Sequence, residues 1–207
     1  MTSPTPVLET DNARNINVWK DAEVYVSTEA DPKVNADGTF DPAVWNFFGL
    51  LNEGTEIAQE LDVERNDINS FGRKLQMKDV RFNKDTRTVT ALEENETNFK
   101  ILWPGSEFKQ NGATVLMAPK NAAHVYVAFK TVNSFGDILI DISRDRAFAF
   151  SAGAGKTDEG ASTTEFTFEV PEDEDGGLYD ELRIRKTEGI TVSDLEPIRV
   201  KEAVETP

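Results

Sequence analysis

Apolar and polar residues alternate with a period of two along much of the chain, a pattern typical of β-strands that bury one face. The clearest run, residues 164–170, places three apolar side chains opposite three polar ones: Phe166, Phe168 and Val170 against Glu165, Thr167 and Glu169. Similar alternation recurs in five more runs, at residues 22–27, 125–130, 138–142, 147–150 and 182–185. Short turn-rich gaps separate several of these runs. The sequence therefore predicts a mainly β fold, an antiparallel β-sandwich or barrel.

One segment, residues 94–103, has helical spacing instead. Phe99, Leu102 and Trp103 fall at i, i+3 and i+4, and Pro104 ends the pattern. Acidic residues near its start suit the positive end of the helix dipole. So short a helix is unstable in isolation, so we expect one α-helix packed on the flank of the sheet.

Three segments lack the alternation of a packed core. Residues 1–15 and 195–207 are expected to be extended terminal arms, and residues 29–44 a long polar loop that contains two prolines. The remainder, residues 16–194, is expected to form a single β-sandwich domain.

Composition narrows the possible functions. The chain of 207 residues has 13 Phe and 3 Trp, enough apolar surface for a globular domain. It has 22 Lys and Arg against 38 Asp and Glu, a net charge of −16 that argues against binding phosphate groups or an anionic membrane. Cysteine is absent and His124 is the single histidine, which excludes disulfides, thiolate catalysis and multi-histidine metal sites. No apolar run approaches the roughly 18–20 residues of a membrane helix.

Three local patterns suggest chemistry, but each fits it poorly. Residues 153–157 end as a phosphate-binding loop does, yet Phe150 stands where that loop needs its first glycine. The acidic residues of 31–41 do not match a calcium loop, because Lys33 occupies a required acid position. The acidic run 172–175 has nothing nearby in sequence that would raise one carboxyl pKa selectively. We therefore expect no catalytic, cofactor-binding or metal site, and a protein that is not an enzyme.

Basic residues gather in one part of this acidic chain. Residues 65–87 hold seven basic and three acidic side chains, a local charge of 7 − 3 = +4. A nucleic-acid patch is conceivable, but the aromatic residues there follow the alternation of a core. Contact with an acidic region of another copy explains the segregation better, because it gives self-association a fixed orientation. The candidates for this inter-subunit charge patch are Arg73, Lys74, Lys78 and Arg81.

Three motifs in the middle of the chain occur in an order that resembles a known family. Residues 45–54 (WNFFGLLNEG) form an aromatic–glycine–aliphatic strand that enters an acidic glycine turn. Residues 66–71 (NDINSF) follow, and residues 88–98 (TVTALEENETN) have the pattern of a strand-to-helix junction. Their order and spacing resemble the major tail tube proteins of long-tailed, non-contractile bacteriophages. The resemblance spans residues 16–170, about three quarters of the chain.

The resemblance implies a structural virion protein without an active site or cofactor. Members of that family stack as hexameric rings into a tube around a tape-measure protein, alongside a tail terminator and distal tail proteins. Double-stranded DNA later passes through the bore without specific binding. Such a subunit would assemble in the host cytoplasm, act in the virion tail and contact no membrane. The sequence does not separate a tail tube protein from ring-forming proteins of the same fold, such as the tail terminator.

By the same resemblance, the loop at 29–44 and the two terminal arms would bridge neighbouring rings. We expect these segments to be unpacked in the free subunit and to become ordered on assembly. The candidate inter-ring contacts are Asp31, Lys33, Asn35, Asp37, Phe40 and Asp41.

An alternative of a different class is a β-sandwich carbohydrate-binding module or another phage surface-binding module. It would use Trp19, Trp45 and Phe47 as an aromatic platform for the ligand. Exposure of all three side chains would favour such a module, and burial of all three would favour the tube subunit.

Overall fold

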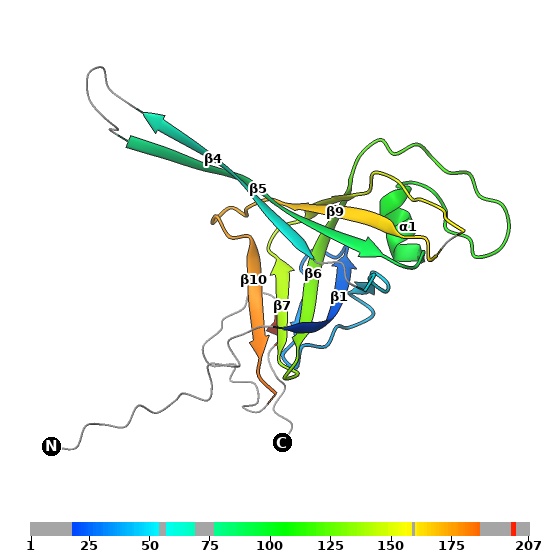
Figure 1. The fold of residues 1–207 in the computed structure, drawn as a ribbon, viewed down its shortest axis with the longest axis horizontal. Helices are drawn as coiled ribbons and strands as arrows, with labels where there is room; N and C mark the ends of the chain where they lie inside the picture. Colours follow the sequence, from blue (N-terminus) through cyan, green and yellow to red (C-terminus); the bar gives the residue numbers. More distant parts are fainter. Residues whose placement is uncertain (1–17, 54–56, 69–76, 159, 187–199, 202–207) are drawn as a thin grey trace.

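The computed structural model describes residues 18–53, 57–68, 77–158, 160–186 and 200–201, and within them it contains eleven strands and one helix (Figure 1). The predicted mainly β class is confirmed. The elements in chain order are β1 (Trp19–Ser27), β2 (Val34–Asn35), β3 (Asn46–Phe47), β4 (Ala58–Ile68), β5 (Met77–Ala91), α1 (Glu96–Leu102), β6 (Ala123–Asn133), β7 (Ile138–Ser143), β8 (Ala147–Phe150), β9 (Thr164–Val170), β10 (Tyr179–Ile184) and β11 (Val200–Lys201).

Nine strands form one antiparallel sheet in the order β10-β7-β6-β8-β9-β5-β4, with β1 on the other edge of β6 and β3 paired to β1. Strands β7 and β8 follow each other along one edge of β6 and then part, because β7 pairs with β10 whereas β8 pairs with β9. We call β1, β3, β6, β7 and β10 the β6 half, and β4, β5, β8 and β9 the β9 half. The two halves run across each other in Figure 1. Over the described residues the sheet is open, so the closed barrel allowed by the sequence pattern is not formed.

The main core lies between the two halves. Phe166, Phe168 and Val170 of β9 are buried, as the alternation predicts, and Glu165 on the opposite face is exposed. Phe48, which follows β3, packs its ring edge-on against Phe166 and Phe168 at centroid distances of 4.9 and 5.6 Å. Aromatic contacts of this kind stabilise the crossing of the two halves beyond the area that they bury.

A second core covers the opposite face of the β6 half, and the segment at 29–44 supplies much of it. Val34 is fully buried, and Trp45, just beyond the segment, is 2% exposed. The ring of Phe40 stacks on Tyr25 of β1 with 3.8 Å between centroids. The Trp45 indole N–H donates to the Lys33 carbonyl at 3.0 Å. The expectation that this loop is unpacked is therefore wrong for the free subunit.

The physical reason is that β6 is buried on both faces. Val127 and Phe129 point into the main core, while Tyr126 and Ala128 point into the second one. A sheet with two apolar faces needs a cover on each side. A few apolar side chains within an otherwise polar loop are enough to provide it, and polar composition conceals them.

The helix is confirmed within two residues of its expected bounds. Asn95 is its N-cap: the side-chain oxygen accepts from the backbone N–H groups of Thr97 and Asn98, each at 3.0 Å. The Asn98 side chain accepts in return from the Asn95 N–H, which completes a capping box. Phe99 and Leu102 are buried as the spacing predicts, so α1 packs on the flank of the sheet.

The terminal arms expected at 1–15 and 195–207 lie almost wholly outside the described residues. The exception is β11, which pairs in parallel with β2 of the loop. No helix among the residues described is both long enough and apolar enough to cross a membrane.

The docked loop generates a stability prediction. We expect Trp45→Ala to lower the free energy of unfolding by about 3–5 kcal/mol, because it leaves a cavity under the loop and removes the hydrogen bond to Lys33. Urea unfolding followed by circular dichroism measures the difference. Trp19→Ala is the matched control, since Trp19 is 42% exposed and its truncation should cost under about 1 kcal/mol. Equal stabilities of the two variants would contradict a docked loop.

Candidate functional site

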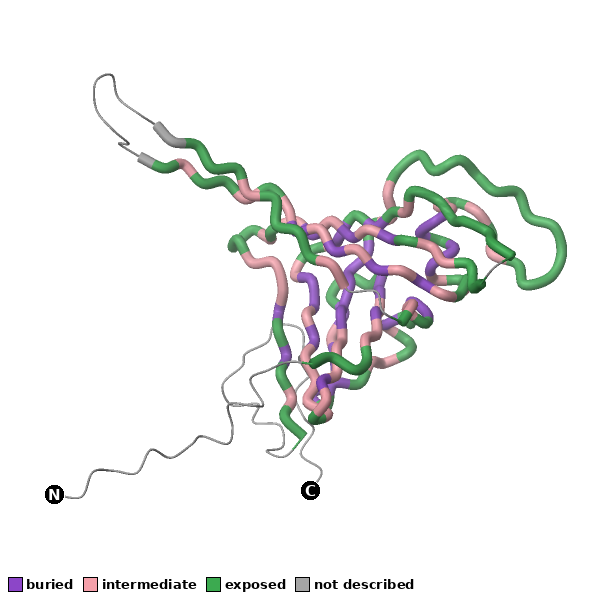
Figure 2. Tube along the Cα trace, viewed as in Figure 1, coloured by how far each residue is buried: buried purple, intermediate pink, exposed green. Residues whose placement is uncertain are grey.

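The most distinctive surface is a long hairpin formed by β4 and β5. Strand β4 pairs along its length with the Met77–Thr88 part of β5, and only Asp85–Ala91 of β5 pairs with β9. Beyond that point the two strands leave the body without a third strand beside them (Figure 1). Figure 2 shows that this projecting part is mostly exposed or half-buried. A two-stranded ribbon is marginal in water by itself, so such a projection favours contact with a partner.

One face of the projecting part carries four apolar side chains, with Arg65 opposite Val80, and lies on the side that β5 turns into the main core. Register places Leu61 opposite Asp85, and Val63 opposite Phe82. A β-bulge at Asn83 shifts the alternation by one residue, so Phe82 and Val80 share the face of Asp85. Leu61 and Val80 are 54% and 57% exposed. We call Leu61, Val63, Val80 and Phe82 the hairpin face.

The basic residues of this region do not form a purely basic surface, because acidic residues lie opposite them on the paired strand or beside them on the same strand. Lys78 is opposite Asp67, and Arg81 is opposite Glu64. Strands β4 and β5 together hold five basic and six acidic side chains, 5 − 6 = −1. Arg73 and Lys74 lie outside the described residues, so the inter-subunit role of the four candidates stays a prediction.

Of the six candidate inter-ring residues, Asp31 and Asp37 are exposed, and Asp31 forms an ion pair with Lys33 at 3.8 Å. Phe40 points inward onto Tyr25. Asn35, Asp37 and Asp41 form hydrogen bonds within the loop. The Asn35 side-chain N–H donates to the Thr39 hydroxyl, and the Asp37 carboxylate accepts from the N–H and the hydroxyl of Thr39. The Asp41 carboxylate accepts from the Ala43 N–H. The bonds from Thr39 lower the pKa of Asp37 below its ordinary value. Contact between rings through this loop stays a prediction.

The aromatic trio of the alternative function is divided. Trp45 is buried in the second core, whereas Trp19 and Phe47 are 42% and 38% exposed. Neither the fully exposed nor the fully buried outcome holds, and a platform of all three rings is not formed.

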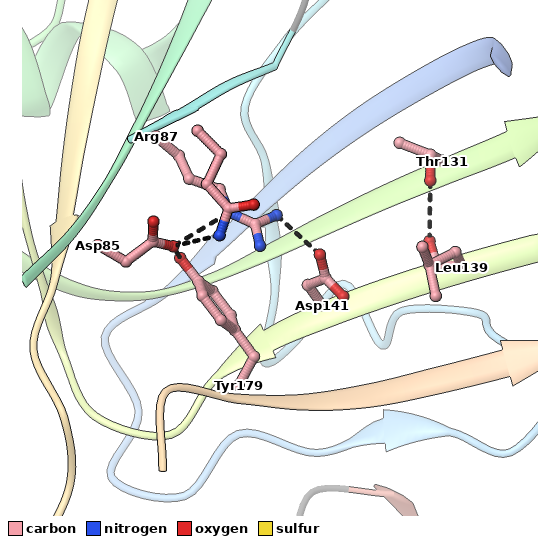
Figure 3. A network of polar contacts seen from close by, with 7 residues as sticks. Asp85, Arg87, Thr131, Leu139, Asp141 and Tyr179 are labelled. Carbon is pink, nitrogen blue, oxygen red and sulfur yellow. Dashed lines mark hydrogen bonds and ion pairs between the residues drawn. The ribbon is translucent and has the colours of Figure 1, made fainter. Parts of the chain in front are cut away.

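A polar network joins the two halves at the base of the hairpin (Figure 3). The Arg87 guanidinium on β5 reaches Asp141 on β7 with 2.7 Å between Nη1 and Oδ2. The Tyr179 hydroxyl, on β10, donates to the Asp85 carboxylate at 2.7 Å, and the side-chain amide of Gln59 donates to the same oxygen at 3.2 Å. The guanidinium also lies over the Tyr179 ring, 4.3 Å from its centroid. This arrangement ties β5 of the β9 half to β7 and β10 of the β6 half.

Burial dominates the electrostatics of this network. Asp85 is fully buried, and its Oδ1 accepts no hydrogen bond from the described residues. Burial raises the pKa of Asp141, and Arg87 offsets only part of that rise. Burial alone would lower the pKa of Arg87, but Tyr179, Asp141 and Asp85 raise it above its ordinary value. Arg87 is therefore charged, and it compensates carboxylates that would otherwise be isolated.

A cavity lies beside this network, lined in part by Arg87 together with Trp19, Leu51 and Phe129. Among the residues that the structure describes, no three His, Asp or Glu side chains gather closely enough to hold a metal ion. His124 is exposed at the start of β6, with its ring 4.5 Å from that of Phe148.

Two of the sequence patterns that resemble binding or catalytic motifs lie in a turn and in a connection between strands. Residues 153–157 belong to the exposed connection between the antiparallel neighbours β8 and β9. In the acidic run 172–175, Asp173 forms an ion pair with Arg144 and accepts from the N–H groups of Asp175 and Gly177. These contacts stabilise a turn.

The alternation of apolar and polar residues does not by itself reveal the Arg87 network. Asp85 and Arg87 occupy the same alternation frame as the buried Val89 and Ala91. Charged residues in the buried frame of a strand are the signal that could have pointed to it.

Comparison with protein-family models finds no model that matches the chain, and comparison with curated protein sequences finds no match either.

The network predicts a strong dependence of stability on Arg87. Arg87→Met should lower the free energy of unfolding by about 3–5 kcal/mol at neutral pH, because Asp85 and Asp141 then lose their buried cation. Arg81→Met on the same strand is the control. Arg81 is 71% exposed in its ion pair with Asp79, so its loss should cost about 0–1 kcal/mol. Urea unfolding compares the two, and equal effects would contradict a supporting role for Arg87.

Tyr179 predicts a loss of stability at alkaline pH. Burial raises its pKa far above the ordinary 10.0, and the hydrogen bond to Asp85 adds to the rise. Because the folded state disfavours the ionised ring, stability should be fully present below pH 10 and fall as the pH rises above it. Urea unfolding across this range should give a shallower decline for Tyr179→Phe than for the natural chain.

Tyr25 provides an internal comparison for that titration. Burial, followed by the Glu23 carboxylate, raises the pKa of Tyr25 to about 12. Tyrosinate absorbance should therefore show Tyr25 ionising before Tyr179, with Tyr25→Phe and Tyr179→Phe assigning the two steps. Identical alkaline behaviour of Tyr179→Phe and the natural chain would contradict burial of a neutral Tyr179.

Proposed function

We propose that this chain is a structural subunit that assembles with copies of itself into stacked hexameric rings, the tail tube of a long-tailed, non-contractile bacteriophage. The observation that carries the proposal is the projecting hairpin with an uncovered apolar face. The order of the three sequence motifs supports the same family.

An open sheet gives this proposal a physical basis. In the order of the described strands, β4 and β10 stand at the two ends of the sheet, and each has one edge without a neighbouring described strand. Unpaired edges and uncovered apolar faces favour association with another chain. Contacts between two different patches on identical subunits generate rings when the rotation closes. Six open sheets arranged in a ring would give a wide barrel with an aqueous bore.

Charge supports passage of DNA without binding. A ring of six subunits carries 6 × (−16) = −96. The β9 half turns a polar face away from the core, with Thr88 on β5 and Glu165 and Thr167 on β9, beside Phe148 and Phe150 of β8. We assign this face to the bore. Acidic and hydroxyl side chains there would repel or only weakly contact phosphate, so that DNA slides through.

The proposal also names partners and a location. The subunit would assemble around a tape-measure protein, meet the tail terminator and distal tail proteins at the tube ends, and reside in the virion tail after assembly in the host cytoplasm.

Assembly of the purified chain tests the proposal. We expect negative-stain electron microscopy at high protein concentration to show hollow tubes of uniform diameter or six-fold rings. Added salt should increase the light scattering of the sample, because it screens repulsion between subunits that each carry −16. Compact monomers at every salt concentration that also bind a glycan array would overturn the proposal in favour of a carbohydrate-binding module.

A further inference from the structure

Two apolar surfaces are uncovered on the described part of the chain at sites far from each other. The first is the hairpin face. The second is a short segment in the connection between α1 and β6, in which Val115, Leu116 and Met117 are 76%, 49% and 48% exposed. Consecutive exposed apolar residues are unusual on a monomer and indicate a contact surface.

The connection that carries the second surface is long and irregular. Residues 103–122 form no helix or strand, although long connections of this kind are uncommon and usually functional. A few bonds fix its shape: the Met117 N–H donates to the Ser106 hydroxyl and the Thr114 hydroxyl donates to the Glu107 carbonyl, each at 2.8 Å. We call residues 114–118 the loop segment.

The loop segment is also free of charge. No charged residue occurs from 110 to 119, although the chain as a whole has 22 basic and 38 acidic side chains. On the hairpin face the central pair, Val63 and Phe82, is uncharged, whereas Arg65 lies opposite Val80 and Asp85 lies opposite Leu61. Burying one of these surfaces against the other therefore desolvates no charge at its centre.

The two surfaces cannot meet within one copy. Val80 precedes Ala91 by eleven residues along β5, which corresponds to about 36 Å of strand. The loop segment follows only after α1, on the far side of Ala91. Figure 1 shows the hairpin and the connection after α1 extending from opposite ends of the molecule.

We propose that the loop segment of one copy docks on the hairpin face of the next, in a head-to-tail contact. The inference rests on the proposed self-assembly and specifies its contact. The two surfaces differ from each other, so each subunit offers one of each, as ring closure requires. The hairpin face lies on the same side of β5 as the main core but beyond Asp85 and Arg87, so the docked segment would add a separate apolar contact there.

Disulfide trapping tests the contact, since the chain has no cysteine of its own. Val80→Cys and Leu116→Cys are prepared as separate full-length chains, one with a mass tag, mixed and oxidised. We expect the yield of the mixed Val80–Leu116 disulfide dimer to be several-fold higher than the yield of either dimer that joins two copies of the same variant. Adding Leu61→Glu to the Val80→Cys chain should return the yield to the level of the same-site dimers, because a charge then lies in the apolar contact.

Leu50→Cys is the matched control. Leu50 is 60% exposed and lies on neither surface, so its pairing with Leu116→Cys reports random collision. A Val80–Leu116 yield no higher than this control would overturn the docking contact.

The same samples separate this inference from the proposed function. If electron microscopy shows tubes but the Val80–Leu116 disulfide yield equals that of the control, the docking contact is wrong and the proposed tube function is still supported. The double variant Val80→Cys/Leu116→Cys should form a ladder of covalent oligomers. A ladder without rings or tubes would support the contact and count against the tube.

Discussion

The structure depends on the ion pair between Arg87 and Asp141, because it connects the two halves of the sheet where they cross. A buried carboxylate such as Asp85 is tolerated only where a cation compensates it, and Arg87 is that cation. Arg87 lies on the strand that continues outward as the hairpin. Holding its guanidinium between Asp141 and the Tyr179 ring therefore fixes the position of β5 over β7. Buried ion pairs add little net stability compared with apolar packing, so we assign this one to orientation: it determines the direction in which the hairpin leaves the body.

Packing on both sides of the β6 half then determines which surfaces stay uncovered. One face meets the β9 half across Phe48 and the β9 aromatic residues, and the other receives the loop through Val34 and Trp45. These two cores use most of the large apolar side chains near the body. The large apolar side chains that stay exposed include Leu61 and Val80 on the hairpin face and three consecutive residues of the loop segment, besides others on the body such as Trp19, Leu50 and Phe148. Self-association is consistent with this division, since the body needs no partner to bury its own core.

Sequence alone predicted the parts of the fold in which each strand has one clear face. Strand β9 matches its expected range residue for residue, and α1 follows from its spacing and from the proline after it. The docked loop was missed because three separated apolar residues do not form a periodic pattern. The length of β4 was missed for a different reason: most of it lies outside the core, so charged residues occupy both faces. Asp85 and Arg87 belong to a third kind: two charged residues in the buried frame of a strand are a local signal, but their partners Tyr179 and Asp141 are too distant in sequence to be identified from it.

The β-bulge at Asn83 argues that the hairpin face is a surface to be covered. Without the extra residue, strict alternation outward from Asp85 would place Asn83 and Arg81 on the core side and turn Phe82 and Val80 to the other. In a ribbon surrounded by water, either arrangement would expose both faces equally, and the bulge would only disrupt the ladder. The one-residue shift is favourable only if another molecule excludes water from the hairpin face. It then keeps Val80 and Phe82 on the same side of β5 as the buried Val89. The irregular strand and the uncovered apolar face are thus both consistent with the proposed contact, in which the hairpin face is covered by a neighbouring copy.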